Sequence, residues 1–285
     1  MKINLSIIIC SRNRSEKLRR CLEHINIEEM QRLKGELILI NNNSTDNTKK
    51  IMESFKNNVN FPVIIIDELK IGKSIGLNKA IKKIRGETII FIDDDCYLTK
   101  DYLTIASKIF KSGEFDYCGG QIWLYDKIDA KIAIDYNKKK FIIPPFSFLK
   151  PGIIQGANML FHRKVINKIG LFDMLMGPGT SFVAEDIEYA ARASWAGFTG
   201  AHIPELIVYH HHGRKKAEEK KQWKSYYLGH GAYYIKFILK GKFIYIKKWF
   251  ELSKYSKKRI FIELKGALIY MIIRLKNKFK NGQIK

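Results

Sequence analysis

Short apolar runs rich in β-branched residues alternate with segments of helical spacing over the first hundred residues. The runs predict buried strands at Leu5–Cys10, Glu36–Ile40, Val63–Ile66 and Thr88–Ile92. The segments between them predict helices at Ser15–Ile25, Asn47–Phe55 and Ser74–Ile84. This order is typical of an α/β fold, with a mostly parallel sheet and helices on both faces.

Polar clusters follow three of the predicted strands. They are Ser11–Arg14, Asn41–Asp46 and Asp93–Asp95. Parallel strands end at the same edge of a sheet, and ligands of such folds bind beyond those carboxyl ends. The pattern therefore predicts one ligand site built from all three clusters.

The second half of the chain has weaker signals. Residues such as Pro144-Pro145 interrupt any regular pattern over residues 115–150, and we interpret this whole stretch as a variable loop region. Regular signals return over residues 153–213, with a helix at Ile187–Trp195 and a strand at Leu206–Tyr209. From residue 214 the chain is lysine-rich, aromatic and of helical spacing.

The charge divides the chain at the same place. The net charge is +23, of which residues 214–285 contribute +17, from 21 Lys and Arg against four Asp and Glu. Residues 1–213 contribute the remaining +6. We therefore predict an α/β domain at residues 1–213 and a basic, aromatic-rich helical extension at residues 214–285, which requires an anionic partner.

Composition excludes several classes of protein. At 46% hydrophobic residues the chain can bury a core, so disorder is not expected. The four cysteines show no C-x-x-C spacing, which indicates neither a zinc site nor a disulfide framework and fits a reducing cytoplasm. The apolar start is interpreted as a strand rather than a signal peptide, and no apolar run is long enough for a spanning helix.

Three clusters are candidates for chemistry. The adjacent carboxylates Asp93-Asp94-Asp95 repel one another, and a divalent cation would relieve that repulsion. An exposed acidic turn explains the triplet about equally well. Glu185-Asp186 precedes a helix, where the dipole would keep Asp186 ionised as a proton acceptor, although simple N-capping is the stronger reading of the pair alone.

His210-His211-His212 ends the last predicted strand. Imidazole binds Mn²⁺-class metals together with carboxylates, and alternation along a strand allows at most two of the three into one site. A solvated strand end is the competing interpretation. Gly72-Lys73-Ser74 lacks the spacing of a P-loop, but Lys73 before a helix can still meet a diphosphate. G-x-G-x-x-G does not occur, which disfavours a dinucleotide-binding fold.

Seven segments, in order, resemble glycosyltransferase family 2 of the GT-A fold, over residues 4–213. They are Ser6–Arg14, Asn42–Asp46, Gly76–Ala80, Phe91–Asp95, Gly156–Met159 with Gly170–Asp173, Glu185-Asp186, and Pro204–His210. The resemblance implies a Rossmann-like domain that binds a nucleotide-diphosphate sugar and transfers its sugar.

The resemblance also implies residue roles. Asp186 matches the catalytic base, and Asp95 and His210 match the ligands of a Mn²⁺ or Mg²⁺ ion. The matching donor-binding positions are Cys10, Arg12, Arg14, Asn42, Lys73, Asp93, Asp94, Gly156 and Asn158. Asn42 stands where several members place an Asp against uracil, so UDP-, dTDP- and GDP-sugars all remain candidate donors.

One base without a carboxylate nucleophile implies an inverting hexosyltransferase. The implied acceptor is a glycan or lipid-linked glycan of cell-surface polysaccharide, lipopolysaccharide or glycolipid synthesis. Two alternatives stay open: a catalytically inactive GT-A-like scaffold, and a sugar nucleotidyltransferase of the same fold.

Aromatic residues interleave with lysines in the extension. Such a pattern suits an anionic membrane surface, which would place the protein peripherally at the inner, cytoplasmic face of the plasma membrane. Packing of the extension on the first domain, or a homodimer contact, is the main alternative. Nucleic acid is not the expected partner.

Overall fold

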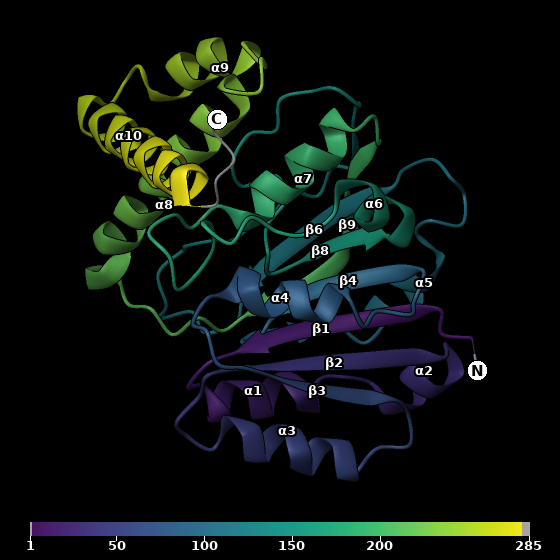
Figure 1. Cartoon of the computed structure of the whole chain (residues 1–285). Helices are drawn as coiled ribbons and strands as arrows, with labels where there is room; N and C mark the ends of the chain where they lie inside the picture. The colour runs from purple at the N-terminus through teal and green to yellow at the C-terminus, as the bar shows by residue number, and fades with distance from the viewer. Residues whose placement is uncertain (1, 281–285) are drawn as a thin grey trace.

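A nine-stranded sheet forms the centre of the computed structural model, which describes residues 2–280 (Figure 1). The strands are β1 Leu5–Ser11, β2 Gly35–Asn42, β3 Val63–Glu68, β4 Thr88–Asp93, β5 Cys96–Leu98, β6 Tyr117–Leu124, β7 Phe141–Ile143, β8 Met159–His162 and β9 Gly200–His210. The helices are α1 Ser15–Glu23, α2 Ile27–Arg32, α3 Thr48–Asn57, α4 Lys73–Ile81, α5 Tyr102–Lys108, α6 Arg163–Ile169, α7 Glu185–Trp195, α8 Lys216–Ile238, α9 Ile244–Ser253 and α10 Lys257–Lys280.

The strand order is β3-β2-β1-β4-β8-β6-β9-β5, and β7 pairs with β9. The first four strands are parallel, as the alternation of strands and helices predicts. The second half is mixed, because β8 lies antiparallel between β4 and β6, while β6 and β9 are parallel. A buried strand has the same apolar sequence in either orientation, so the pattern could not predict this reversal.

β6 corrects the interpretation of residues 115–150 as a loop region. This strand lies inside the sheet, between β8 and β9. The sequence does not predict this strand, because Gly119 and Gly120 interrupt the apolar pattern. A Cβ on Gly120 would lie 2.2 Å from the carbonyl oxygen of Leu206, and the register shifts after this residue, so the glycine marks a bulge with close backbone contact.

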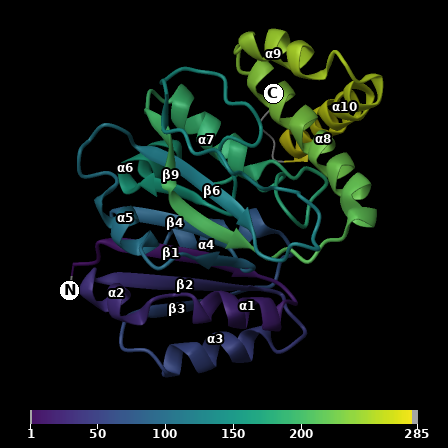
Figure 2. The same cartoon turned by 180° about the vertical axis from the view of Figure 1, so that it is seen from behind.

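Alternate side chains of β1 fill two apolar layers, one on each face of the sheet. Ile7 and Ile9 pack with residues of α1, α2, α3 and α5, whereas Ile8 packs with residues of α4, α6 and α7. Figures 1 and 2 show these two sets of helices from opposite sides. All four cysteines are unpaired, which agrees with the expectation that no disulfide framework forms.

The helical extension packs on the sheet domain. Tyr233, Phe237 and Tyr245 belong to the same apolar cluster as Ile8 of β1. α8 and α10 cross in close contact at glycines, since a Cβ on Gly231 would lie 1.8 Å from the Glu263 carbonyl oxygen. The domain boundary at residue 213 stays a prediction. The inner side of the extension packs on the first domain, as the alternative to a membrane contact supposed.

No helix in the described part of the chain combines the length and the apolar character that crossing a bilayer requires.

A buried ion cluster joins α7 to the extension. Lys236 of α8 lies with its ammonium 2.7 Å from Glu188 and 2.5 Å from Asp173. Glu188 is fully buried and also pairs with Arg192 at 2.8 Å, while the Tyr270 hydroxyl of α10 donates to Asp173 at 2.8 Å. The α7 helix, which begins at Glu185, is therefore fixed from α8 through Glu188, while α10 reaches the same cluster through Asp173.

We expect Lys236→Met to lower the free energy of unfolding by about 3 kcal/mol. The methionine keeps the apolar stem but leaves Glu188 and Asp173 as buried carboxylates without this partner. Denaturant unfolding of the full chain measures the change. In the control, Lys140→Met removes a half-exposed pair with Glu114 and should change stability by less than about 0.5 kcal/mol. Equal losses in the two variants would contradict the prediction.

Candidate active site

A cavity of about 780 Å³ opens at the carboxyl ends of β1, β2 and β4, where the sequence predicts the ligand site. Its walls also include the start of α4, the start of α7 and one side of α8. The predicted residues that line it are Cys10, Arg12, Arg14, Asn42, Lys73, Asp93, Asp94, Asp95, Gly156, Asp186 and His210. Folding thus brings these residues together from positions up to two hundred apart in the chain.

The acidic triplet occupies the turn between β4 and β5. Asp94 accepts hydrogen bonds from the Ser11 hydroxyl at 2.6 Å and from Arg14 at 2.7 Å. Burial raises the pKa of Asp94 to about 6, although Arg14 opposes this shift. The side chain of Asp94 therefore fixes Arg14.

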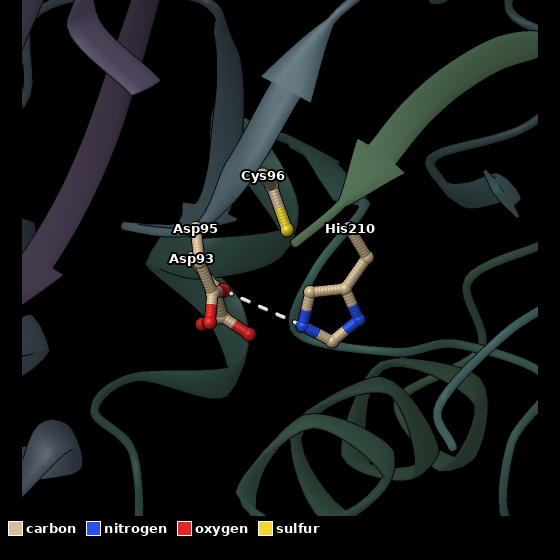
Figure 3. A group of neighbouring side chains, drawn as sticks. All are labelled: Asp93, Asp95, Cys96 and His210. Atoms are coloured by element: carbon tan, nitrogen blue, oxygen red, sulfur yellow. Dashed lines mark ion pairs between the residues drawn. The ribbon is translucent and has the colours of Figure 1, made fainter. Parts of the chain in front are cut away.

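Asp95 points toward His210 (Figure 3). Its Oδ1 lies 3.4 Å from His210 Nε2, which is long for a hydrogen bond, and Oδ1 has no hydrogen-bond partner in the described part of the chain. Its Oδ2 accepts from Arg14 at 2.8 Å. Burial opposes ionisation of Asp95, but His210 and Arg14 outweigh it and hold the pKa below the usual value.

The donor set suits a divalent cation. Ligand atoms of Asp93, Asp95, Cys96 and His210 all lie within 4.8 Å of one another (Figure 3). Burial raises the pKa of Cys96 well above its usual value, so this thiol stays protonated and is a poor ligand. Two carboxylates and one imidazole remain, a combination that Mn²⁺ and similar ions accept, and a cation would supply the missing partner of Asp95 Oδ1.

His210 is the only one of the three consecutive histidines that lines the cavity. Its Nδ1 lies 3.4 Å from the Ala133 carbonyl oxygen, and its Nε2 faces Asp95. His211 bonds to the Tyr97 hydroxyl at 2.8 Å. His212 uses both ring nitrogens on backbone groups, namely the Ala130 carbonyl and the Arg214 N–H.

Lys73 bridges two acidic groups at the floor of the cavity. Its ammonium lies 2.5 Å from Asp93 and 3.2 Å from Glu185. Burial opposes its charge, but these carboxylates raise the pKa of Lys73 well above the usual value. Lys73 therefore stays charged at the N-terminus of α4, where an anionic ligand is also favoured.

Asp186 lies in the first turn of α7. Its Oδ2 accepts from the Gly156 N–H at 2.8 Å and its Oδ1 accepts from the Ile187 N–H at 2.7 Å. We expect the helix dipole to keep this group ionised near neutral pH. Burial raises its pKa, and the two N–H groups oppose that rise. A carboxylate with a raised pKa is a stronger proton acceptor.

Two predicted donor-binding residues have structural roles. The Asn42 amide accepts from Gly72 N–H at 2.8 Å and donates to the Lys70 carbonyl at 2.7 Å, so it fixes the loop before α4. Asn158 does not line the cavity. It bonds to the Tyr102 hydroxyl at 2.7 Å and to the carbonyls of Gln121 and Leu206, each at 2.9 Å, and so ties β6 to β9 at the bulge.

Cys10 and Arg12 lie on the β1 side of the cavity. Burial raises the pKa of Cys10 to about 12, so it remains a thiol that packs near Gly76. Arg12 is exposed and has no ion pair within residues 2–280.

The sequence analysis missed one wall of the site. Trp223 and Tyr226 of α8 line the cavity, and so do Lys131, Lys150 and Arg214. The aromatic residues lie in the segment that we assigned to a separate extension. No periodic signal distinguishes them from their aromatic neighbours, since α8 is apolar on several sides.

Comparison with known proteins agrees with this geometry. The sequence profile described as glycosyl transferase family 2 matches residues 6–170. Glycosyltransferase AglE of Haloferax volcanii is 22% identical over 220 residues, which is 77% of this chain and 71% of AglE. For several other curated relatives the match covers between 18% and 61% of their length.

Two solved structures share the fold. TarS 1-349 of S. aureus in complex with UDP superposes with a TM-score of 0.64 at 14% identity, over 89% of this chain and 74% of that one. The mannosyltransferase PcManGT of Pyrobaculum calidifontis, in complex with GDP-Man and Mn²⁺, gives 0.59 at 15% identity, over 95% and 76%. The sheet and the acidic site therefore define a protein of the GT-A fold. Since the profile covers more than half of the chain, the chain belongs to glycosyl transferase family 2.

We expect Asn158→Ala to lower the free energy of unfolding by about 2 kcal/mol. The substitution leaves the Tyr102 hydroxyl and two buried carbonyls without their partner. Denaturant unfolding measures the loss, and Asn57→Ala, at an exposed helix end, is the control that should change little. A wild-type stability combined with weaker nucleotide binding would restore the donor-binding role.

Proposed function

We propose that this family member is an inverting, metal-dependent glycosyltransferase that moves a sugar from a nucleotide-diphosphate sugar to an acceptor hydroxyl of a cell-surface glycan. The observation that carries the proposal is a single cavity that holds a partly buried base, Asp186, and a carboxylate–imidazole set, Asp95 with His210. Nucleotide ligands in the two similar structures support the donor class.

Asp93, Asp95 and His210 are the residues that would hold the cation. When bound, it supplies positive charge against the diphosphate of the donor. Arg14 and Lys73 add fixed positive charge beside those carboxylates. The same groups therefore balance the buried acids and favour an anionic donor in this part of the cavity.

Asp186 is the proposed general base. Its two backbone contacts fix the carboxylate at the cavity wall, where it takes the proton of the acceptor hydroxyl. Glu185 is the nearest other carboxylate of α7, but it pairs with Lys73, and burial raises its pKa to about 7. With one available base and no free carboxylate nucleophile beside it in the described residues, a single displacement inverts the anomeric centre.

The nucleotide and metal requirement is directly testable. We expect UDP, dTDP or GDP to raise the melting temperature by a few degrees, and only with Mn²⁺ or Mg²⁺ present. A ligand at a hundred times its dissociation constant stabilises by about 2.7 kcal/mol.

His210→Ala should weaken Mn²⁺ binding, measured by electron paramagnetic resonance, about tenfold or more, whereas His24→Ala, at the surface, should not.

The same nucleotide panel, together with a turnover measurement, tests the base. Asp186→Asn should keep the nucleotide-induced rise in melting temperature. It should lower the rate of sugar release from the matching nucleotide sugar by roughly 10²- to 10⁴-fold. Unchanged turnover would remove Asp186 from the proposal. If no nucleotide shifts the melting temperature, the inactive scaffold becomes the better description.

We further propose that the extension places the enzyme on an anionic membrane surface at its cytoplasmic face. An apolar stripe covers the outward side of α9 and α10. It consists of Phe243, Ile246, Phe250, Phe261, Leu264, Leu268, Ile272 and Leu275, which are between 43% and 71% exposed. The helical spacing of the α10 members keeps them on one face, and lysines such as Lys254, Lys258 and Lys265 lie among them.

Vesicle co-sedimentation tests the membrane contact. We expect binding to phosphatidylcholine vesicles to rise when about a third of the lipid is phosphatidylserine, and to fall with salt. The variant Leu264→Ser/Leu268→Ser should bind at least tenfold more weakly than the control Leu69→Ser/Ile128→Ser, which removes apolar side chains exposed elsewhere.

A different result would identify the homodimer. If Leu264→Ser/Leu268→Ser turns a dimer into a monomer, as measured by light scattering, and leaves vesicle binding unchanged, the stripe is a protein interface rather than a membrane contact.

A further inference from the structure

Besides Arg12, three basic side chains line the cavity without a paired carboxylate. Lys131 and Lys150 lie in loops and Arg214 lies just before α8, and none of the three forms an ion pair with any side chain in residues 2–280. By contrast, Arg14 and Lys73 in the same cavity are paired with carboxylates at 2.5–2.8 Å. The cavity therefore holds both charge-balanced cations and cations without a counter-charge.

Acidic residues in the loop that carries Lys131 have other partners and do not pair with the three cations. Asp135 also lines the cavity, but its carboxylate faces His202 Nε2 at 3.3 Å. Asp129 pairs with Lys215 at 2.7 Å and lies outside the lining. Cations that gather in a concave wall without counter-ions raise the local concentration of anions.

Aromatic side chains of α8 line the same cavity. Trp223 is partly exposed, and its indole N–H donates to Glu219 at 3.3 Å, which orients the ring. Burial raises the pKa of Tyr226 to about 12, so its hydroxyl remains a hydrogen-bond donor, and it lies close enough to Arg214 and Asp186 to feel their charges. An aromatic face packs on the apolar face of a sugar or polyol chain, and the hydroxyl bonds its polar groups.

We propose that these three cations and the two aromatic side chains form an acceptor subsite for a phosphate-bearing substrate. The inference rests on the proposed transferase function and adds the chemical class of the acceptor. Lys131, Lys150 and Arg214 hold the phosphate ester, Trp223 and Tyr226 hold the adjoining sugar or polyol, and the attacking hydroxyl lies toward Asp186. The phosphate belongs either to a polymer phosphodiester or to a lipid phosphate, since both present the same anion.

Binding to the nucleotide-loaded protein tests this subsite. The full chain is saturated with Mn²⁺ and the nucleoside diphosphate that stabilises it most, and then titrated calorimetrically with glycerophosphoglycerol, with dodecyl phosphate and with neutral diglycerol. We expect at least one phosphate compound to bind tenfold or more tightly than diglycerol. Preference for glycerophosphoglycerol identifies a polymer phosphodiester, and preference for dodecyl phosphate identifies a lipid phosphate.

The variant Lys131→Gln/Lys150→Gln/Arg214→Gln should weaken that phosphate binding tenfold or more. Its affinity for the nucleoside diphosphate should stay within about twofold of wild type. The matched control Lys138→Gln removes an exposed lysine of the same loop region that does not line the cavity, and it should change neither affinity.

Three results would overturn the subsite. Equal binding of diglycerol and both phosphates would show that charge is not recognised. Full phosphate binding by the triple variant would place the anion elsewhere, and loss of nucleotide affinity in that variant would assign these cations to the donor. Each of these outcomes leaves the nucleotide and metal requirement standing, so the subsite fails separately from the transferase function.

Discussion

The concentration of carboxylates at one edge of the sheet is the constraint on which the rest of the site depends. Asp93, Asp94, Asp95, Glu185 and Asp186 all line one cavity, and three of them are almost fully buried, namely Asp94, Asp95 and Glu185. Buried like charges are costly unless they are paired or solvated by dipoles. Each acid therefore has compensating partners: a cation, a histidine or a pair of backbone N–H groups.

The compensation also separates the acids chemically. Arg14 and His210 keep Asp95 ionised, while Asp186 receives only backbone N–H groups and has a raised pKa. The first environment suits a metal ligand and the second suits a proton acceptor. Carboxylates of the same kind thus acquire different uses from their neighbours rather than from their own chemistry.

The helical extension is part of this site and not only an attachment to it. Lys236 fixes α7 through Glu188, two residues after the proposed base, and α8 contributes Trp223 and Tyr226 to the cavity. Meanwhile the outward sides of α9 and α10 remain apolar and basic. One segment therefore links the surface that we propose as the membrane contact to the cavity wall that would bind the acceptor.

The sequence alone determined the parallel half of the sheet, because β-branched runs and helical spacing repeat strictly over the first hundred residues. It also located the acidic triplet and Asp186, since strand ends and helix starts are local features. It could not place β6, whose glycines suit a backbone contact with Leu206 that exists only in the folded chain. Likewise, local pattern alone could not distinguish His210 from His211, which only the family resemblance did, or a donor-binding Asn158 from a structural one. Partners 37 to 114 residues away decide where each side chain points. Local patterns fix elements, but the pairing of side chains across them is a property of the tertiary structure.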